Sequence, residues 1–101
     1  MMKQKVILSA KKKILFLPHA IKQMSRPDRM ITAKEIRYAI FFGEIIEEYP
    51  EDSRGESCLI FHATQRRVIH VVCAPKDAYL SIITAYLPAP GQWSSDFKRR
   101  R

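Results

Sequence analysis

Two histidines occupy positions where an imidazole could act as an acid or a base. His19 follows Pro18 at the start of a predicted helix, and the free backbone amides there could also hold a phosphate. A neutral imidazole at this position can act as a base or as a hydrogen-bond donor. A histidine at a helix start can also be a simple cap or a packed residue, so both interpretations of His19 stay open.

The second histidine, His70, lies between Ile69 and Val71 in the most apolar predicted strand. Side chains alternate along a strand, so His70 is either a core residue with satisfied ring nitrogens or projects from an open sheet face beside Tyr86. In the second case, the two histidines suit metal-free RNA cleavage. One group would deprotonate the 2′-hydroxyl and the other would protonate the leaving oxygen.

An arginine near these histidines could stabilise the charge that develops on a phosphate in the transition state. The candidates for this role are Arg26, Arg29, Arg66 and Arg67. Aromatic side chains could stack on the bases of a single-stranded substrate, and these are Tyr38, Phe41, Tyr86 and Trp93. Their spacings also suit a hydrophobic core, so this second set is open to either interpretation.

Several familiar catalytic patterns are absent from the sequence. It contains no phosphate-binding loop, dinucleotide fingerprint, zinc-protease motif or hydrolase elbow. His62 and His70 are eight residues apart without helical pairing, so neither a metal site nor a cofactor is expected. Cys58 and Cys73 lie in separate apolar runs without a CxxC pattern, which favours buried free thiols in a reducing compartment.

The charge of this 101-residue chain is strongly positive and unevenly distributed. The formal net charge is +8, and the first 37 residues hold ten basic and two acidic residues. This pattern favours a polyanion at one face, although a basic surface without a nucleic-acid role would look similar. The residues expected to contact nucleic acid are Lys11, Lys12, Lys13, Arg26, Arg66, Arg67, Arg99 and Arg100. The lysine run also divides the apolar N-terminal stretch, so we expect no signal peptide, no membrane span and a cytoplasmic location.

The elements that must position these residues follow from periodicity. Helices are expected at 3–13, from Pro18 to about Arg26, and from Thr32 to Gly43, where Thr32 and Glu35 form a capping box and Gly43 a left-handed cap. A short strand is expected at 14–17. Four further strands are expected at 44–49, 57–63, 68–74 and 79–87, as an antiparallel meander in which Cys58 lies opposite Cys73. We therefore expect one α+β domain over residues 1–101, with helices on a four-stranded antiparallel sheet and a basic tail at 92–101.

Ordered motifs from His19 to Tyr86 resemble the small bacterial domain-of-unknown-function family 4258. They are His19-Ala20-x-x-x-Met24, Arg29-x-Ile31-Thr32, Gly43-Glu44-Ile45-Ile46-Glu47-x-Tyr49-Pro50, Ser57-Cys58-Leu59, Ile69-His70-Val71-Val72 and Ile83-Thr84-x-Tyr86. The resemblance implies a RelE/ParE-like, barnase-like toxin fold and a YgiT-type zinc-finger antitoxin as partner. It puts His19, Arg29, His70 and Tyr86 at the characteristic polar positions. Gln23 departs from the family, since many members carry arginine there.

The hypothesis that follows is a metal-independent endoribonuclease, the toxin of a type II toxin–antitoxin pair, acting on messenger RNA. His19 and His70 would be the acid and base, Arg29 would stabilise the phosphorane, and Tyr86 would position the substrate. Two alternatives stay open. The chain is either a non-catalytic module that binds nucleic acid or protein, or a ParE-like inhibitor of a protein target such as gyrase.

Overall fold

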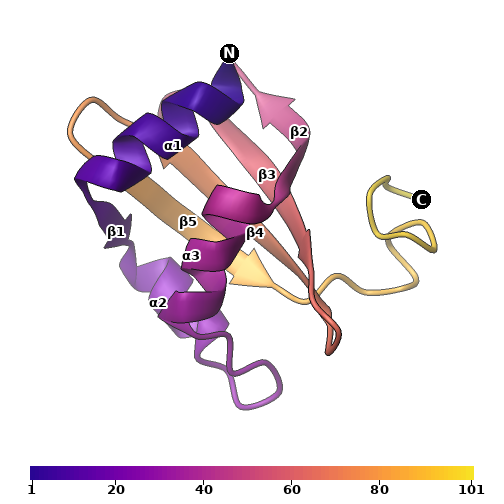
Figure 1. The fold of residues 1–101 in the computed structure, drawn as a ribbon. Coiled ribbons are helices and arrows are strands. Elements are labelled where there is room, and N and C mark those ends of the chain that lie inside the picture. Colours follow the sequence, from indigo (N-terminus) through magenta and orange to yellow (C-terminus); the bar gives the residue numbers. More distant parts are fainter.

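The computed structural model describes residues 1–101 as three helices and five strands (Figure 1). The helices are α1 (Met2–Lys12), α2 (Pro18–Met24) and α3 (Ala33–Phe42). The strands are β1 (Ile14–Phe16), β2 (Glu44–Tyr49), β3 (Ser57–Ala63), β4 (Val68–Pro75) and β5 (Leu80–Tyr86). The α+β prediction is confirmed. None of the helices combines the length and the apolar character that a membrane span needs.

All five strands form one mixed sheet in the order β1-β5-β4-β3-β2. β2 to β5 make the expected antiparallel meander. The short strand expected at 14–17 is present as β1. The prediction of a four-stranded, wholly antiparallel sheet is wrong, because β1 joins the edge of the sheet parallel to β5, with Ile14 opposite Leu80 and Phe16 opposite Ile82. Parallel neighbours need a long crossover, and the chain between β1 and β5 is long enough to supply one.

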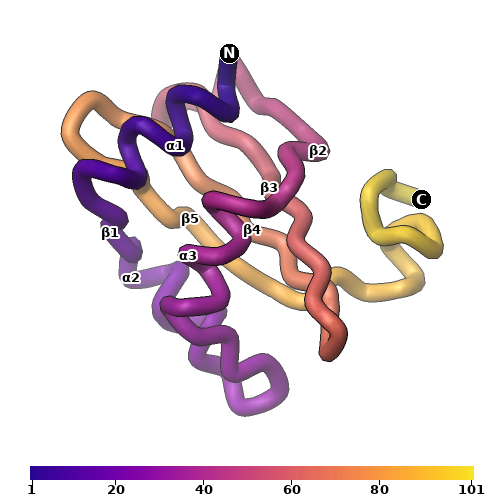
Figure 2. Tube along the Cα trace, viewed as in Figure 1, coloured from indigo at the N-terminus to yellow at the C-terminus, as the bar shows by residue number.

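The core lies between the sheet and the helices α1 and α3, which cover one of its faces (Figures 1 and 2). Val6 of α1 and Ile36 of α3 belong to the same buried cluster as Val71 of β4. α2 packs against β5 and adds Ala20 and Met24 to the same buried cluster. Ile21 of this short helix is 51% exposed.

α3 begins and ends for different physical reasons. At its start the predicted capping box is confirmed, since the Thr32 hydroxyl accepts from the Glu35 amide and the Thr32 amide donates to the Glu35 carboxylate, both over 3.1 Å. At its end, Gly43 is extended (φ −80°, ψ −179°) and not left-handed as predicted. A Cβ there would lie 2.6 Å from Cγ2 of Ile60 and 2.7 Å from the Phe61 carbonyl oxygen. The Ala39 carbonyl oxygen of α3 would lie closer still, so the last turn of α3 and the close approach of β3 together require this glycine.

The predicted register between β3 and β4 is confirmed. Cys58 lies opposite Cys73, and Phe61 lies opposite His70. The two cysteine Sγ atoms are 3.8 Å apart in the core, and both thiols are free and buried. The hydrogen bond with Cys58, together with burial, raises the pKa of the Cys73 thiol well above its ordinary value. Both cysteines therefore act as small apolar core residues.

The sheet face opposite α1 and α3 is covered by the C-terminal segment 88–101, here called the strap, which contains the expected basic tail. Figure 2 shows the strap in yellow, leaving β5 and turning back on itself. Trp93 is its anchor, because only 2% of this side chain is exposed and its ring lies 4.5 Å from that of His70. A backbone bridge pairs Trp93 with Arg100 and closes the turn.

Candidate functional site

A hollow of about 430 Å³ lies where α2, the C-terminal half of β5 and the start of the strap meet. β1 pairs only with Leu80, Ser81 and Ile82, so the rest of β5 has no strand on that side. α2 occupies the vacant edge and brings its polar side chains to the far face of the sheet. The polar residues lining the hollow are His19, Gln23, Arg29, Thr84, Tyr86 and Gln92.

Three of the four predicted catalytic residues, His19, Arg29 and Tyr86, therefore line one hollow. They come from a helix, a loop and a strand, and they are up to 67 residues apart in sequence. His19 is exposed in the first turn of α2, where its imidazole is open to solvent. A phosphate in the hollow would therefore meet an imidazole, a guanidinium and a phenol.

Arg29 is held at one nitrogen and free at the other two. Its Nη1 donates to the side-chain oxygen of Gln23 over 3.0 Å and to the Gln23 carbonyl over 3.3 Å. Its Nε and Nη2 make no hydrogen bond within the chain, so they are available to an anion. Gln23, the departure from the family pattern, thus orients Arg29 without adding a charge.

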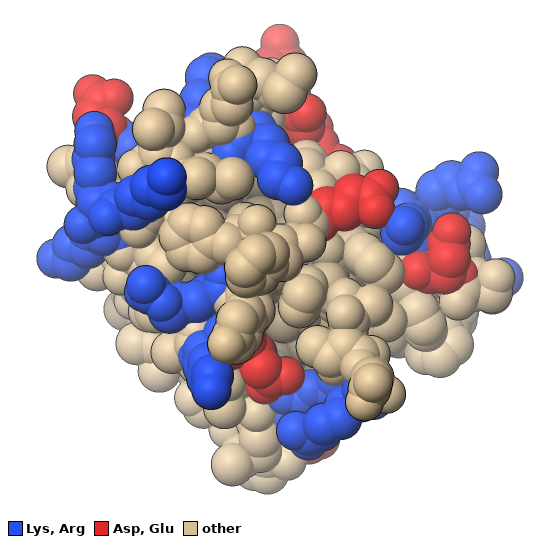
Figure 3. Space-filling view, viewed as in Figure 1, with Lys and Arg blue, Asp and Glu red and all other residues tan.

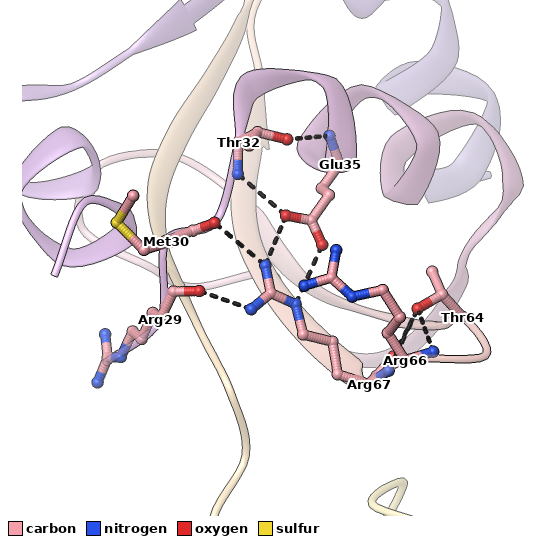
Figure 4. Close-up of polar contacts among 7 residues, drawn as sticks. All are labelled: Arg29, Met30, Thr32, Glu35, Thr64, Arg66 and Arg67. Atoms are coloured by element: carbon pink, nitrogen blue, oxygen red, sulfur yellow. Dashed lines mark hydrogen bonds and ion pairs between the residues drawn. The ribbon is translucent and has the colours of Figure 1, made fainter. Parts of the chain in front are cut away.

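A network around Arg67 fixes the backbone from which Arg29 projects (Figure 4). Arg67 donates from Nη1 to the Arg29 carbonyl over 2.6 Å and from Nη2 to the Met30 carbonyl over 3.2 Å. It also binds both carboxylate oxygens of Glu35, at 3.1 and 2.6 Å. Met30 has a positive φ of 50°, a conformation that a non-glycine residue keeps only when its surroundings hold it. The guanidinium of Arg67 is therefore engaged inside the protein.

Burial raises the pKa of Glu35, but the hydrogen bonds from Arg67 and from the Thr32 amide outweigh it and leave that pKa below its ordinary value. The same carboxylate thus caps α3 and binds Arg67. Arg67 also donates to the Arg29 carbonyl. Through Arg67, hydrogen bonds therefore connect the start of α3 to the backbone of Arg29.

His70 lies on the predicted sheet face beside Tyr86, but the strap covers it completely. Its Nε2 is 2.8 Å from the Phe97 carbonyl oxygen and therefore carries the proton. In a neutral ring Nδ1 is then an acceptor, and the Tyr86 hydroxyl, 3.3 Å away, donates to it. His70 thus reaches the hollow only through Tyr86. Of the two alternatives left open for His70, the core residue with satisfied ring nitrogens is the one observed, because the strap occupies that face.

Burial lowers the pKa of His70, while the hydrogen bond to Phe97 and the nearby Glu47 carboxylate oppose this shift. Burial also raises the pKa of the Tyr86 hydroxyl. At neutral pH both groups are uncharged. Nδ1 of His70 can then accept the proton of the Tyr86 hydroxyl, which lies between His70 and the hollow.

Ion pairs bind the strap to β2, the edge strand of the sheet opposite β1. Arg100 binds Glu47 of β2 through Nε and Nη2, over 3.0 to 3.2 Å, and its guanidinium lies 4.8 Å from the centre of the Trp93 ring. Lys98 pairs with Glu44 over 2.9 Å. Phe97 has a positive φ of 61°, which turns its carbonyl toward His70. The basic tail is therefore part of the folded structure.

The residues expected to bind nucleic acid do not gather at the hollow. Lys13 lies beside Leu80, at the end of β5 that is roughly 20 Å from Tyr86. Lys11 and Lys12 precede it on α1. Arg26 pairs with Asp28 on an exposed loop. The others divide into the engaged pair Arg67 and Arg100, described above, and the exposed pair Arg66 and Arg99.

Sequence reasoning missed several parts of this site. Thr84 has a usable signal, since it lies two residues from Tyr86 and so shares its face of β5. For Gln92 and the Phe97 carbonyl the sequence offers no such signal, because both lie in a segment without regular secondary structure. The pairing of Glu47 with Arg100 joins residues 53 positions apart, so no local pattern predicts it.

Comparison with known proteins identifies the family but no individual relative. The profile of the domain-of-unknown-function family DUF4258 matches residues 16–87, which include every residue of the hollow except those from the strap. No curated protein and no solved structure matches the chain. The matched region spans most of the sequence, and on this basis the chain belongs to the family DUF4258.

Proposed function

We propose that this protein is an endoribonuclease toxin that cleaves RNA by acid/base chemistry without a metal ion. The observation that carries the proposal is the convergence of His19, Arg29 and Tyr86 on one hollow, with His70 hydrogen-bonded behind Tyr86. These groups are the minimum set for transfer of a phosphoryl group to the 2′-hydroxyl: a proton acceptor, a proton donor and a cation for the phosphate.

In the proposed reaction, the 2′-oxygen of a ribose bonds to the adjacent phosphorus and the bond from phosphorus to the 5′-oxygen breaks. The 2′-hydroxyl proton passes to the Tyr86 oxygen while the Tyr86 proton passes to Nδ1 of His70. The resulting imidazolium keeps its hydrogen bond to the Phe97 carbonyl. His19, starting as the imidazolium, gives a proton to the 5′-oxygen and becomes neutral, and Arg29 binds the phosphate through Nε and Nη2. The products are a 2′,3′-cyclic phosphate and a 5′-hydroxyl.

A RelE/ParE-like relationship, a type II antitoxin partner such as a YgiT-type zinc-finger protein, and messenger RNA as substrate belong to the same proposal. The helices on one face of an antiparallel meander and the net charge of +8 support them. The cationic chain favours a polyanionic substrate through the release of counterions.

The test is to incubate the purified protein with a random-sequence RNA pool and with the matching DNA pool, with and without ribosomes. We expect RNA fragments that end in 2′,3′-cyclic phosphate and intact DNA. His19→Ala and Arg29→Ala should each lower the cleavage rate by roughly 100-fold or more. Arg26→Ala is the matched control, since this exposed arginine does not line the hollow, and it should cleave like the wild type. Absence of cleavage by the wild type, or full activity of His19→Ala, would contradict the proposal.

A second candidate function is a non-catalytic module that binds nucleic acid or protein. The observation that favours it is the enclosure of His70, whose two ring nitrogens are both satisfied inside the protein, as in a structural histidine. RNA binding that weakens steeply with salt, without any cleavage, would support this function. Inhibition of a protein target in the manner of ParE belongs to the same class.

A further inference from the structure

The outer face of α3 carries an aromatic stripe that no part of the chain covers. Lys34, Arg37, Tyr38, Phe41 and Phe42 line an open groove of about 370 Å³. Tyr38 and Phe42 stack on each other with their ring centres 6.0 Å apart, yet they are 48% and 72% exposed. Large apolar side chains this exposed on one helix face mark an interaction surface.

The neighbouring helix extends this surface. Leu8 of α1 is 62% exposed and, with Gln4 and Ile7, lines a second hollow of about 310 Å³. Lys3 donates to the Gly43 carbonyl over 3.2 Å, which ties the start of α1 to the end of α3. Figure 3 views this helical layer from outside and shows uncharged surface at its centre, with lysine and arginine mainly on its left and lower sides and acidic groups at its top, right and lower margins. We call this surface the α1–α3 face.

The charge of the α1–α3 face selects the kind of partner. The two helices contain six basic residues: Lys3, Lys5, Lys11, Lys12, Lys34 and Arg37. Lys5 pairs with Glu56 over 2.7 Å, and the other five have no carboxylate partner. Their only acidic residue is Glu35, and its carboxylate is bound by Arg67. A symmetric pairing of two copies through this face would bring like charges together, so the face complements an acidic partner.

The spacing of the stripe selects the shape of the partner. The lining residues recur at intervals of three and four along α3, so they share one face of this helix, and such a face packs well against a second helix. Leu8 and Ile7 are aliphatic and offer no ring on which a base could stack. α1 and α3 also cover the sheet face opposite His70, so the α1–α3 face does not continue the proposed RNA path.

From the aromatic stripe, its basic margin and its position we infer that the α1–α3 face binds an amphipathic helix of a partner protein. That helix carries apolar anchors along one side and carboxylates on its flanks. This inference goes beyond the proposed function, because it holds whether or not the hollow cleaves RNA. Phe42 is the central anchor site, and Lys34 and Arg37 contact the acidic flank.

The experiment measures binding of the whole chain to a fluorescent synthetic helix about five turns long. The helix carries leucines at three- and four-residue spacing and glutamates on both flanks, and a second peptide replaces every glutamate with lysine. We expect the glutamate peptide alone to bind. Phe42→Ser should weaken this binding at least tenfold, whereas Ile21→Ser, a similarly exposed apolar residue on α2, should leave it unchanged.

A charge swap distinguishes a specific face from general attraction. Lys34→Glu with Arg37→Glu should lose the glutamate peptide and gain the lysine peptide. Lys22→Glu with Arg99→Glu changes the net charge equally at exposed sites elsewhere and should keep the wild-type preference. Equal effects of the two double variants would overturn the inference, and so would equal binding of both peptides.

Three other results would also overturn it. The first is a wild-type dimer that Phe42→Ser dissociates, because the occupant would then be a second copy. The second is binding to anionic vesicles that depends on Phe42, and the third is single-stranded RNA binding that depends on Phe42. If Phe42→Ser loses the peptide but cleaves RNA at the wild-type rate, helix binding at the α1–α3 face and RNA cleavage at the hollow are separate functions.

Discussion

The guanidinium of Arg67 donates to the backbone carbonyl of Arg29 over 2.6 Å, so one arginine holds another in place. Of two arginines adjacent in sequence, Arg67 is a structural residue and Arg66 is exposed in the turn between β3 and β4. The sequence gives these neighbours the same chemistry, and the fold gives them different roles.

Arg67→Ala should lower the free energy of unfolding by about 2 kcal/mol, because it leaves the Glu35 carboxylate and two carbonyls without their charged donor. Arg66→Ala is the matched control and should change stability by no more than about 0.5 kcal/mol. Urea titration followed by circular dichroism measures both variants. Equal stability of the two would contradict the assigned roles.

Stability should fall as the pH drops below 6.5, the ordinary pKa of histidine. Because burial lowers the pKa of His70, the unfolded chain binds a proton in this range before the folded chain does, and protonation then favours unfolding. His70→Gln keeps a donor and an acceptor without titrating, so it should reduce this pH dependence. His62→Gln, on the neighbouring strand β3, should leave the dependence in place. A pH profile of His70→Gln that matches the wild type would show that His70 is not its source.

Gly43→Ala should cost about 2 kcal/mol of stability, since the added Cβ would meet the backbone of β3 and of α3 itself. Gly91→Ala provides the comparison, because nothing lies within 4 Å of its Cβ position, and it should stay within about 0.5 kcal/mol of the wild type. Thermal unfolding of both proteins measures the difference. A neutral Gly43→Ala variant would mean that β3 and α3 can separate without loss.

Trp93→Ala should open the strap and expose His70. Removal of this buried ring should cost about 3 kcal/mol and should raise the rate at which diethyl pyrocarbonate modifies His70. Arg99→Ala, an exposed residue of the same strap, should change neither quantity. If diethyl pyrocarbonate modifies His70 of Trp93→Ala no faster than His70 of the wild type, contacts other than Trp93 cover His70.

The local parts of the fold were predictable from the sequence. The capping box of Thr32 and Glu35 depends on residues three apart, and the opposition of Cys58 and Cys73 follows from a tight hairpin between two apolar runs. Both rest on short-range geometry that residue types determine.

The distant parts were not predictable. Pairing of β1 with β5 joins residues 66 apart, and the contact of Phe97 with His70 joins irregular chain to a strand. The closeness of His19, Arg29 and Tyr86 could be expected only from family resemblance, because no local pattern links a helix, a loop and a strand. Gly43 shows the same limit at one residue, since part of its cause is the close approach of β3, which lies more than ten residues further along the chain.

The shortness of β1 also leaves the space beside β5 that α2 and the hollow occupy. A strand of three residues leaves the last part of β5 without a neighbour, and α2 turns into that space directly after Pro18. Two more paired residues in β1 would displace the helix that carries His19 and seal this border of the sheet. Lineages that lengthen this strand should therefore lose the opening together with the histidine, whatever molecule enters it.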